Sequence, residues 1–344
     1  MNIYTFNDAI ETLSNNDKPL LLLGNGFSQA CKPDIFSYKS LLEKADFTNL
    51  STYAPEAFTK LKTTDFEAVI KVLRDASKIV SLYKKTDKKL SSLLKDDATG
   101  IKKVLVETIA KHHPTMPSDI SSTQFEACWK FLNHFFKVYT LNYDLLLYWT
   151  GMHFLDNNTI KRKLEFDDGF LHPSGYDESD YVTWGDGEPY DQKIFYLHGA
   201  LHLFESESEL KKFTWIRTGI RLTTQINIAL NKEMYPLVVA EGTSTQKRGR
   251  IMRSEYLGKG FRSFQTQKGT LFVYGLAFSD NDSHILDAIM KSKIKKMWIS
   301  LYGSPTKPNN KKLIEKSKSF TRNVNSRIPL EVNFFDAESA KIWG

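Results

Sequence analysis

Cysteine is scarce in this chain, which has only two, Cys31 and Cys128, among its 344 residues. A structural zinc site takes four ligands, commonly cysteines in closely spaced pairs, and no C-x-x-C spacing occurs in the sequence. Two cysteines therefore exclude a four-cysteine zinc module. We interpret both as reduced, partly buried thiols.

Long hydrophobic runs are also missing. No apolar run approaches the roughly 20 residues that a membrane-spanning helix needs. The first residues, Met1–Thr5, lack the basic and apolar segments of a secretory signal. With 41% hydrophobic and 25% charged residues, the composition is that of an ordinary globular protein. We expect a cytoplasmic protein without membrane association.

The net charge is modestly positive, at +7. Lysines are concentrated in residues 84–103 and 307–318, where Leu or Ile residues are interleaved with them. This pattern indicates the solvent-facing sides of two helices. Because no basic motif with interleaved aromatic residues accompanies the charge, we do not expect nucleic acid as a partner.

Short apolar runs alternate with segments of helical periodicity along most of the chain. This alternation predicts an α/β fold, with a Rossmann-like, mostly parallel sheet and helices on both of its faces. The predicted strands are residues 20–24, 136–141, 194–198, 237–241, 271–275, 296–301 and 330–335. The predicted helices are residues 6–16, 145–153, 219–232, 252–267, 281–292 and 309–318.

One long segment, residues 27–134, has few convincing strand patterns and is dominated by helical spacing of apolar residues. We predict that it is a helical insertion, and that residues 1–26 and 135–344 together form the Rossmann-like domain. Residues 156–192 are rich in Asp, Gly, Pro and Tyr, which predicts a long irregular excursion of the kind that is usually functional or mobile.

The first predicted strand runs into the sequence G-N-G-F-S at residues 24–28. Glycines at this place let the backbone approach a pyrophosphate, and the N-terminus of a following helix favours negative charge. The G-x-G-x-x-G fingerprint is incomplete, because Gln29 takes the place of its third glycine, and the acidic end of a second strand about 20 residues on is absent. A hydride-transferring dehydrogenase is therefore disfavoured, while a simple tight turn remains an alternative.

Polar residues follow the next two predicted strands. Asn142 and Asp144 come after residues 136–141, and their spacing of two in extended chain turns both side chains to the same side. Capping of the next helix explains one of them but not both. His198 ends the strand at 194–198, where a structural role is the alternative. A metal pair of His198 with His202 is not expected, because no carboxylate or cysteine is near in sequence.

Two later strand ends carry small polar residues. Gly242, Thr243 and Ser244 follow residues 237–241, and cations such as Lys247 come soon after. Hydroxyls and cations suit phosphate or ribose hydroxyls, although a polar turn into a helix has the same composition. Gly275 ends a further strand, ahead of Ser279, Asp280 and a helix start. Gly275 gives a ligand room, whereas the polar residues after it are also ordinary helix caps.

The order of these motifs resembles the sirtuin-like superfamily, and most closely the prokaryotic sirtuin-like proteins that act as NAD-consuming effectors in antiphage defence. The resemblance covers residues 24–282. It implies that Asn142 and Asp144 border the nicotinamide ribose and that His198 is the catalytic histidine, with these three as the catalytic set. The residues that it places around the rest of NAD+ are Gly24, Asn25, Gly26, Phe27, Ser28, Gly242, Thr243, Ser244, Gly275 and Ser279.

The missing zinc module separates the chain from true sirtuin deacylases. The resemblance to the zinc-free branch implies an NAD+ glycohydrolase, with NAD+ as substrate, ADP-ribose and nicotinamide as products, and no metal. A zinc-free NAD-dependent protein deacylase or ADP-ribosyltransferase is the alternative enzyme. A sensor module that binds NAD or ADP-ribose is the alternative without catalysis.

An NAD+ hydrolase without control would kill its own cell. The sequence shows no clear sensor domain beside the predicted sheet domain and the helical insertion. We therefore expect an activating partner subunit, for example a nucleotide-sensing one, or a homo-oligomeric switch, in a system of abortive infection. The insertion and the 156–192 excursion are the expected contact surfaces.

Overall fold

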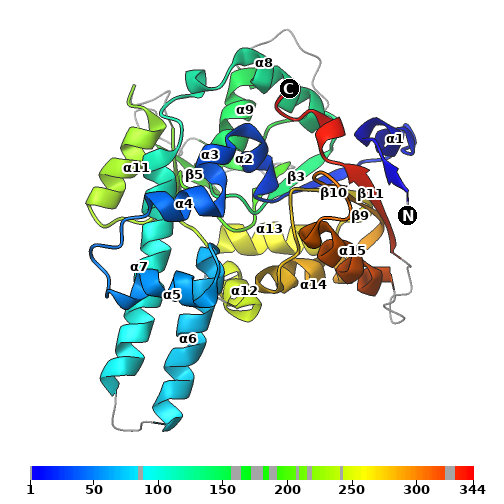
Figure 1. The fold of residues 1–344 in the computed structure, drawn as a ribbon. Helices are drawn as coiled ribbons and strands as arrows, with labels where there is room; N and C mark the ends of the chain where they lie inside the picture. Colours follow the sequence, from blue (N-terminus) through cyan, green and yellow to red (C-terminus); the bar gives the residue numbers. More distant parts are fainter. Residues whose placement is uncertain are drawn as a thin grey trace.

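The computed structural model (Figure 1) describes residues 2–83, 88–155, 164–171, 181–185, 192–206, 209–214, 219–240, 243–321 and 330–344. Within them, one sheet has the strand order β1-β11-β10-β9-β2-β3-β6, and all of its pairings are parallel. This confirms the predicted α/β fold class with a Rossmann-like parallel sheet. The strands are β1 (Ile3–Tyr4), β2 (Leu20–Leu23), β3 (Lys137–Thr140), β6 (Ile194–Tyr196), β9 (Lys268–Tyr274), β10 (Lys293–Leu301) and β11 (Glu331–Asp336).

The central strand β2 is apolar along its whole length because helices cover both faces of the sheet. All four leucines of β2 are at most 1% exposed. Figure 1 shows α1, α8 and α9 on one side of the sheet and α13, α14 and α15 on the other. These helices are α1 (Phe6–Glu11), α8 (Ser122–Leu132), α9 (Leu146–Leu155), α13 (Glu255–Gln265), α14 (Ser283–Lys291) and α15 (Pro308–Thr321).

The described residues of the segment between β2 and β3 form helices joined by turns and loops, and they contain no strand. Figure 1 shows α6 and α7 as a pair that extends away from the sheet, while α8 lies against it. Phe131 of α8 contacts Tyr274 of β9 with ring centroids 5.7 Å apart, so this segment shares the core of the sheet. The other helices are α2 (Gly26–Cys31), α3 (Pro33–Phe36), α4 (Tyr38–Lys44), α5 (Tyr53–Leu61), α6 (Phe66–Tyr83), α7 (Lys88–His112) and the short η1 (Pro117–Asp119).

The prediction of a strand at 237–241 is wrong for residues 237–240, the part of this range that the structure describes. Val238 makes only an isolated antiparallel bridge with Gly199, and the segment does not join the sheet. Residues 237–240 are nevertheless at most 2% exposed. A buried irregular segment has the same apolar composition as a buried strand, and periodicity does not separate the two.

A second, antiparallel sheet of order β4-β5-β8-β7 was not predicted. Its strands are β4 (Phe170–Leu171), β5 (Tyr181–Trp184), β7 (Leu203–Glu205) and β8 (Leu210–Phe213). The described parts of the 156–192 excursion thus include two short strands. The helix α12 (Ser244–Arg253) was also missed, whereas α11 (Leu222–Asn231), α13, α14 and α15 lie within a few residues of their predicted positions.

Among the described residues, no helix combines the length and the apolar character that crossing a membrane requires.

Candidate functional site

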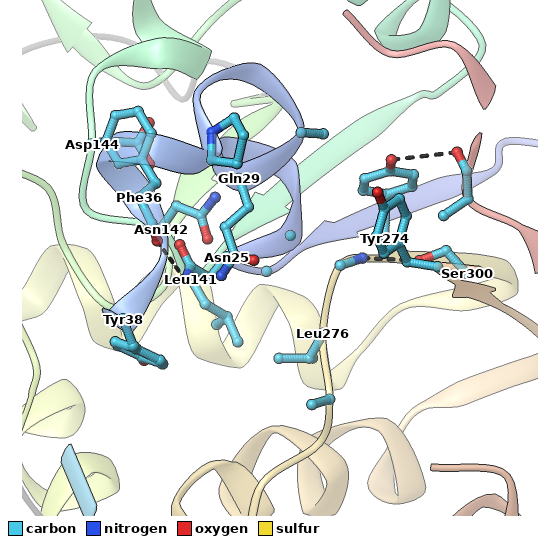
Figure 2. Close-up of a pocket in the computed structure, with 18 of the residues that line it drawn as sticks. Asn25, Gln29, Phe36, Tyr38, Leu141, Asn142, Asp144, Tyr274, Leu276 and Ser300 are labelled. Carbon is cyan, nitrogen blue, oxygen red and sulfur yellow. Dashed lines mark hydrogen bonds between the residues drawn. The ribbon is translucent and has the colours of Figure 1, made fainter. Parts of the chain in front are cut away.

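A cavity of about 970 Å³ lies at the carboxyl edge of the parallel sheet. The strands deliver Gly24, Asn142, His198, Gly275 and Ser300 to its wall. This is the edge at which open α/β sheets bind their ligands. Figure 2 shows side chains from the loop after β2, from the loop after β3 and from the end of β9 around this space. The helices of the insertion close another part of the wall, through Tyr38, Asp65, Glu67, Leu105 and Ile109.

Two glycine-containing turns pack backbone to backbone in the wall. The N–H of Gly26 donates to the carbonyl of Gly275 at 2.9 Å. A Cβ on Gly26 would lie 2.5 Å from the Cα of Gly275, and one on Gly24 would lie 2.6 Å from its carbonyl oxygen. Gly275 itself has φ of +69°, in the left-handed region. This contact requires all three glycines, whatever ligand the cavity holds.

Replacement of Gly275 by Ala is expected to lower the free energy of unfolding by at least about 2 kcal/mol. The left-handed backbone and the contact with Gly26 both oppose a methyl group. The matched control is Gly249→Ala in α12, where a Cβ meets nothing within 4 Å. That change is expected to raise the free energy of unfolding by about 0.5–1 kcal/mol, because alanine favours a helix more than glycine does. Urea denaturation of both variants measures the contrast, and equal stabilities would contradict this account.

Asn142, Ser28 and Asp144 form a buried chain of hydrogen bonds. The Asn142 Nδ2 donates to Ser28 Oγ at 2.8 Å, and the Ser28 hydroxyl donates to the Asp144 carboxylate. The other Asp144 oxygen accepts the backbone N–H of Leu146 at 2.9 Å, at the start of α9. Asp144 therefore caps the helix, as the alternative interpretation held, and also joins the cavity. Burial raises the pKa of Asp144, against the hydrogen bond from Ser28.

His198 meets a second histidine that the sequence did not single out. Its Nε2 lies 2.9 Å from the Nε2 of His284, and the two side chains are 2% and 1% exposed. The Nδ1 of His284 lies 3.2 Å from Ser244 Oγ, which also accepts the backbone N–H of His284. Burial lowers the pKa of His198 well below its usual value, and the charge of Lys247 lowers it further.

Lys247 is a fully buried cation beside these histidines. Its Nζ is paired with the carboxylates of Glu67 in α6 and of Asp282, the latter at 2.8 Å. Burial opposes the charge of Lys247, but the two carboxylates outweigh burial and raise its pKa. Burial similarly opposes the charge of Asp282, and Lys247 outweighs it to lower the Asp282 pKa to about 2. Tyr143 donates to Glu67 at 2.8 Å, which joins the insertion to the loop after β3.

Three of these side chains have the donor types of a metal site. One ligand atom from each of His198, Asp282 and His284 lies within 4.8 Å of the others. The ammonium of Lys247 is bound to the same Asp282 carboxylate, so a metal ion would face a buried positive charge. This charge makes the set a poor fit for a cation.

The predicted site residues that the structure describes fall into two groups. Those that line the cavity are Gly24, Asn25, Gly26, Asn142, Asp144, His198, Gly275 and Ser279. Phe27 lies in the core against Trp343, Ser28 acts between Asn142 and Asp144, Thr243 caps α12, and Ser244 contacts His284. Gly242 lies outside the described residues.

Sequence reasoning missed Glu67, Asp282 and His284 as parts of the site. Asp282 and His284 follow the Gly275 turn closely, so their nearness to a strand end was a usable signal. Glu67 offered none, because it is separated from the sheet motifs by the long helical segment. Lys247 was noted only as a cation downstream of the Gly242 turn, and its complete burial was not foreseen.

His113, the residue that follows α7, holds the loop that carries Asp144. Its Nε2 accepts the backbone N–H of Leu145 at 3.1 Å, and its Nδ1 lies 2.9 Å from the carbonyl of Pro114. The ring must therefore be neutral, with its proton on Nδ1. Burial lowers the pKa of His113 to about 4.

The stability of the fold is expected to depend on pH through His113. Its folded pKa is below the unfolded value of about 6.5, so protonation favours the unfolded chain as the pH falls from about 6.5 to about 4. Over that window, protonation of His113 lowers the free energy of unfolding by up to about 1.4 kcal/mol per pH unit. A His113→Gln variant should lack this share of the pH dependence, whereas His134→Gln at an exposed site should keep it. Identical pH dependence in wild type and His113→Gln would refute the assignment.

The fold and the site define a Rossmann-like α/β protein with a ligand-sized cavity at the carboxyl edge of its sheet. Residues 21–343 match the family model described as Domain of unknown function (DUF4917), and the chain belongs to this family. Comparison with curated proteins gives no match.

Proposed function

We propose that the protein is an NAD+ glycohydrolase that cleaves NAD+ to ADP-ribose and nicotinamide. The observation that carries the proposal is the convergence of Asn142, Asp144 and His198 on one cavity, beside the paired glycine turns. The cavity volume, about 970 Å³, is at the upper end of the range for small-molecule sites and has room for a dinucleotide. The motif order that resembles sirtuin-like NAD hydrolases supports the same substrate.

The reaction requires little acid catalysis from the protein. Nicotinamide leaves the ribose as a neutral molecule, because the ring carries a positive charge in NAD+. The ribose then passes through an oxocarbenium-like state, which a positioned water attacks. The balance is NAD+ and water to ADP-ribose, nicotinamide and one proton, so the site must orient water, hold the ribose and accept that proton.

His198 is the proposed proton acceptor. Its lowered pKa keeps the imidazole neutral at physiological pH, as a base requires. Its Nε2 faces His284, and its Nδ1 has no hydrogen-bond partner among the described residues. Nδ1 is therefore the nitrogen that would take a proton from a ribose hydroxyl or from the attacking water.

Asn142 is proposed to orient the ribose or the water. Its Nδ2 is engaged with Ser28, and its backbone N–H donates to Thr140 Oγ1 at 3.0 Å, so the side chain is held in place. The amide oxygen is left for the substrate. Both Asp144 oxygens have protein partners, which favours a role for Asp144 in positioning Asn142 through Ser28.

The biological setting is part of the proposal. We infer that the enzyme acts in the cytoplasm as an antiviral effector that depletes NAD+ in abortive infection. Control then comes from an activating partner subunit or from homo-oligomerisation. Glu67 of α6 belongs to the insertion and pairs with Lys247, which lies next to His198. The insertion therefore contacts the site directly.

The test is release of nicotinamide from NAD+ by the purified protein, alone and with the products of neighbouring genes. Wild type is expected to release nicotinamide and ADP-ribose in equal amounts, and His198→Ala to lose at least about 100-fold in rate. His134→Ala, at an exposed site, is the control and should be unchanged. An acetyl-lysine peptide in a parallel reaction tests the deacylase alternative. Tight binding of NAD+ without nicotinamide release in any sample would favour the sensor instead.

A further inference from the structure

The hydrogen bond between His198 and His284 can run in either direction, and the groups around the two rings decide which ring donates. Two neutral imidazoles with their Nε2 atoms 2.9 Å apart share one proton, so one ring donates and the other accepts. The direction decides whether the Nδ1 of His198 carries a hydrogen. Only a bare Nδ1 is able to act as a base toward the cavity.

Groups around His284 favour one of the two directions. Ser244 Oγ lies 3.2 Å from its Nδ1, and the backbone carbonyl of Asn281 raises the pKa of the ring, as an acceptor facing a ring N–H does. The Ser244 hydroxyl is able to accept a hydrogen from Nδ1 or to donate its own, whereas the Asn281 carbonyl only accepts and so favours a ring N–H on His284. Because the Nε2 of His284 faces His198, we place that hydrogen on Nδ1. Its Nε2 is then bare and accepts the Nε2–H of His198, which leaves Nδ1 of His198 without a hydrogen.

We propose that His284 is a positioning residue, which holds His198 in the tautomer whose bare Nδ1 faces the cavity. Ser244 holds His284 in turn, at the start of α12. His284 itself is not part of the cavity wall, whereas His198 is. The arrangement resembles the orienting partner of a catalytic histidine, with a neutral imidazole in place of the usual carboxylate or carbonyl. This inference rests on the proposed function for its kinetic consequence but not for the tautomer.

The charges around the pair keep both rings neutral. Lys247 and Asp282 face both histidines, and Arg248 of α12 also faces His284. Burial is the largest effect on each ring and lowers the His284 pKa to about 4. With Lys247 paired to Glu67 and Asp282, the network holds one cation against two carboxylates. The neutral pair therefore persists across the physiological range of pH.

Nitrogen NMR of histidine-labelled protein tests the tautomer directly. In the free wild-type protein, His198 is expected to show a protonated Nε2 and a bare Nδ1. His284→Gln keeps an acceptor near the position of Nε2 and should preserve this tautomer, whereas His284→Leu should lose it. A bare Nε2 on His198 in wild type, or ring signals of metal-bound histidine, would overturn the proposal.

Kinetics of nicotinamide release give the second readout. His284→Leu is expected to lower kcat by about 10- to 100-fold with KM within twofold, because the residue acts through His198 and not on the substrate. His284→Gln should recover most of the rate, and thermal unfolding checks that both variants fold. Full activity of a folded His284→Leu would overturn the positioning role. If the tautomer is found but wild type never cleaves NAD+, the proposed function fails while the geometry of the pair stands.

Discussion

Replacement of Lys247 by Met is expected to lower the free energy of unfolding by about 3–5 kcal/mol. Lys247 is fully buried between Glu67 and Asp282, and its loss leaves two carboxylates in a low-dielectric interior without a cation. The penalty comes from these uncompensated charges, more than from the net value of the ion pairs. Urea denaturation of the full-length chain measures it.

Two companion variants separate this explanation from a loss of packing. Combining Lys247→Met with Glu67→Gln and Asp282→Asn removes the stranded charges, and a large part of the lost stability should return. Lys39→Met breaks an exposed pair with Glu43, whose side chains are 79% and 62% exposed, and should cost at most about 1 kcal/mol. A triple variant less stable than Lys247→Met alone would contradict the charge explanation.

Asn142→Ala is expected to lower kcat for nicotinamide release by about 100- to 1000-fold, the effect of removing a group aimed at the reacting centre. The Asn142 amide is held by Ser28 and lines the cavity, so its removal leaves the ribose or the water without an orienting partner. Ser28→Ala should have a smaller effect, about 10-fold, because Ser28 acts through Asn142 and Asp144.

Steady-state kinetics on NAD+ measure both effects in protein activated in the same way as wild type. Asn231→Ala, on an exposed position of α11, is the matched control and should leave kcat unchanged. If Asn142→Ala folds and keeps kcat within threefold of wild type, Asn142 has no part in the chemistry. If Ser28→Ala costs more than Asn142→Ala, the order of the hydrogen-bond chain is wrong.

Local sequence signals predicted β2, β3, β6 and β9 well because each has a short apolar run that leads into Gly, Asn or His, whereas the two-residue strand β1 was missed. The loops after β2, β3, β6 and β9 all reach one cavity, as the common edge of a parallel sheet requires. The same signal failed at residues 237–240, where burial without pairing gives an equally apolar run. Apolar composition reports burial, and only pairing partners elsewhere in the chain decide between strand and loop.

The parts of the site that escaped prediction depend on contacts between distant segments. Glu67 meets Lys247 across 180 positions of sequence, and His198 meets His284 across 86. Neither pair leaves a local pattern, since Glu67 is an ordinary acidic residue in the first turn of α6. The glycine motif shows the reverse case. From the sequence, its glycines were explained by the close approach of a phosphate. The structure shows that the packing of Gly26 on Gly275 also requires them.

Under the proposed function, water, and not a protein side chain, receives the ADP-ribosyl group of NAD+. Mass spectrometry of the products formed in ¹⁸O-labelled water tests it most directly. We expect one ¹⁸O atom in each ADP-ribose, one nicotinamide released per NAD+ consumed, and loss of both products in Asn142→Ala and His198→Ala. Transfer of ADP-ribose to protein or peptide, or intact NAD+ in every wild-type sample with and without candidate activators, would contradict it.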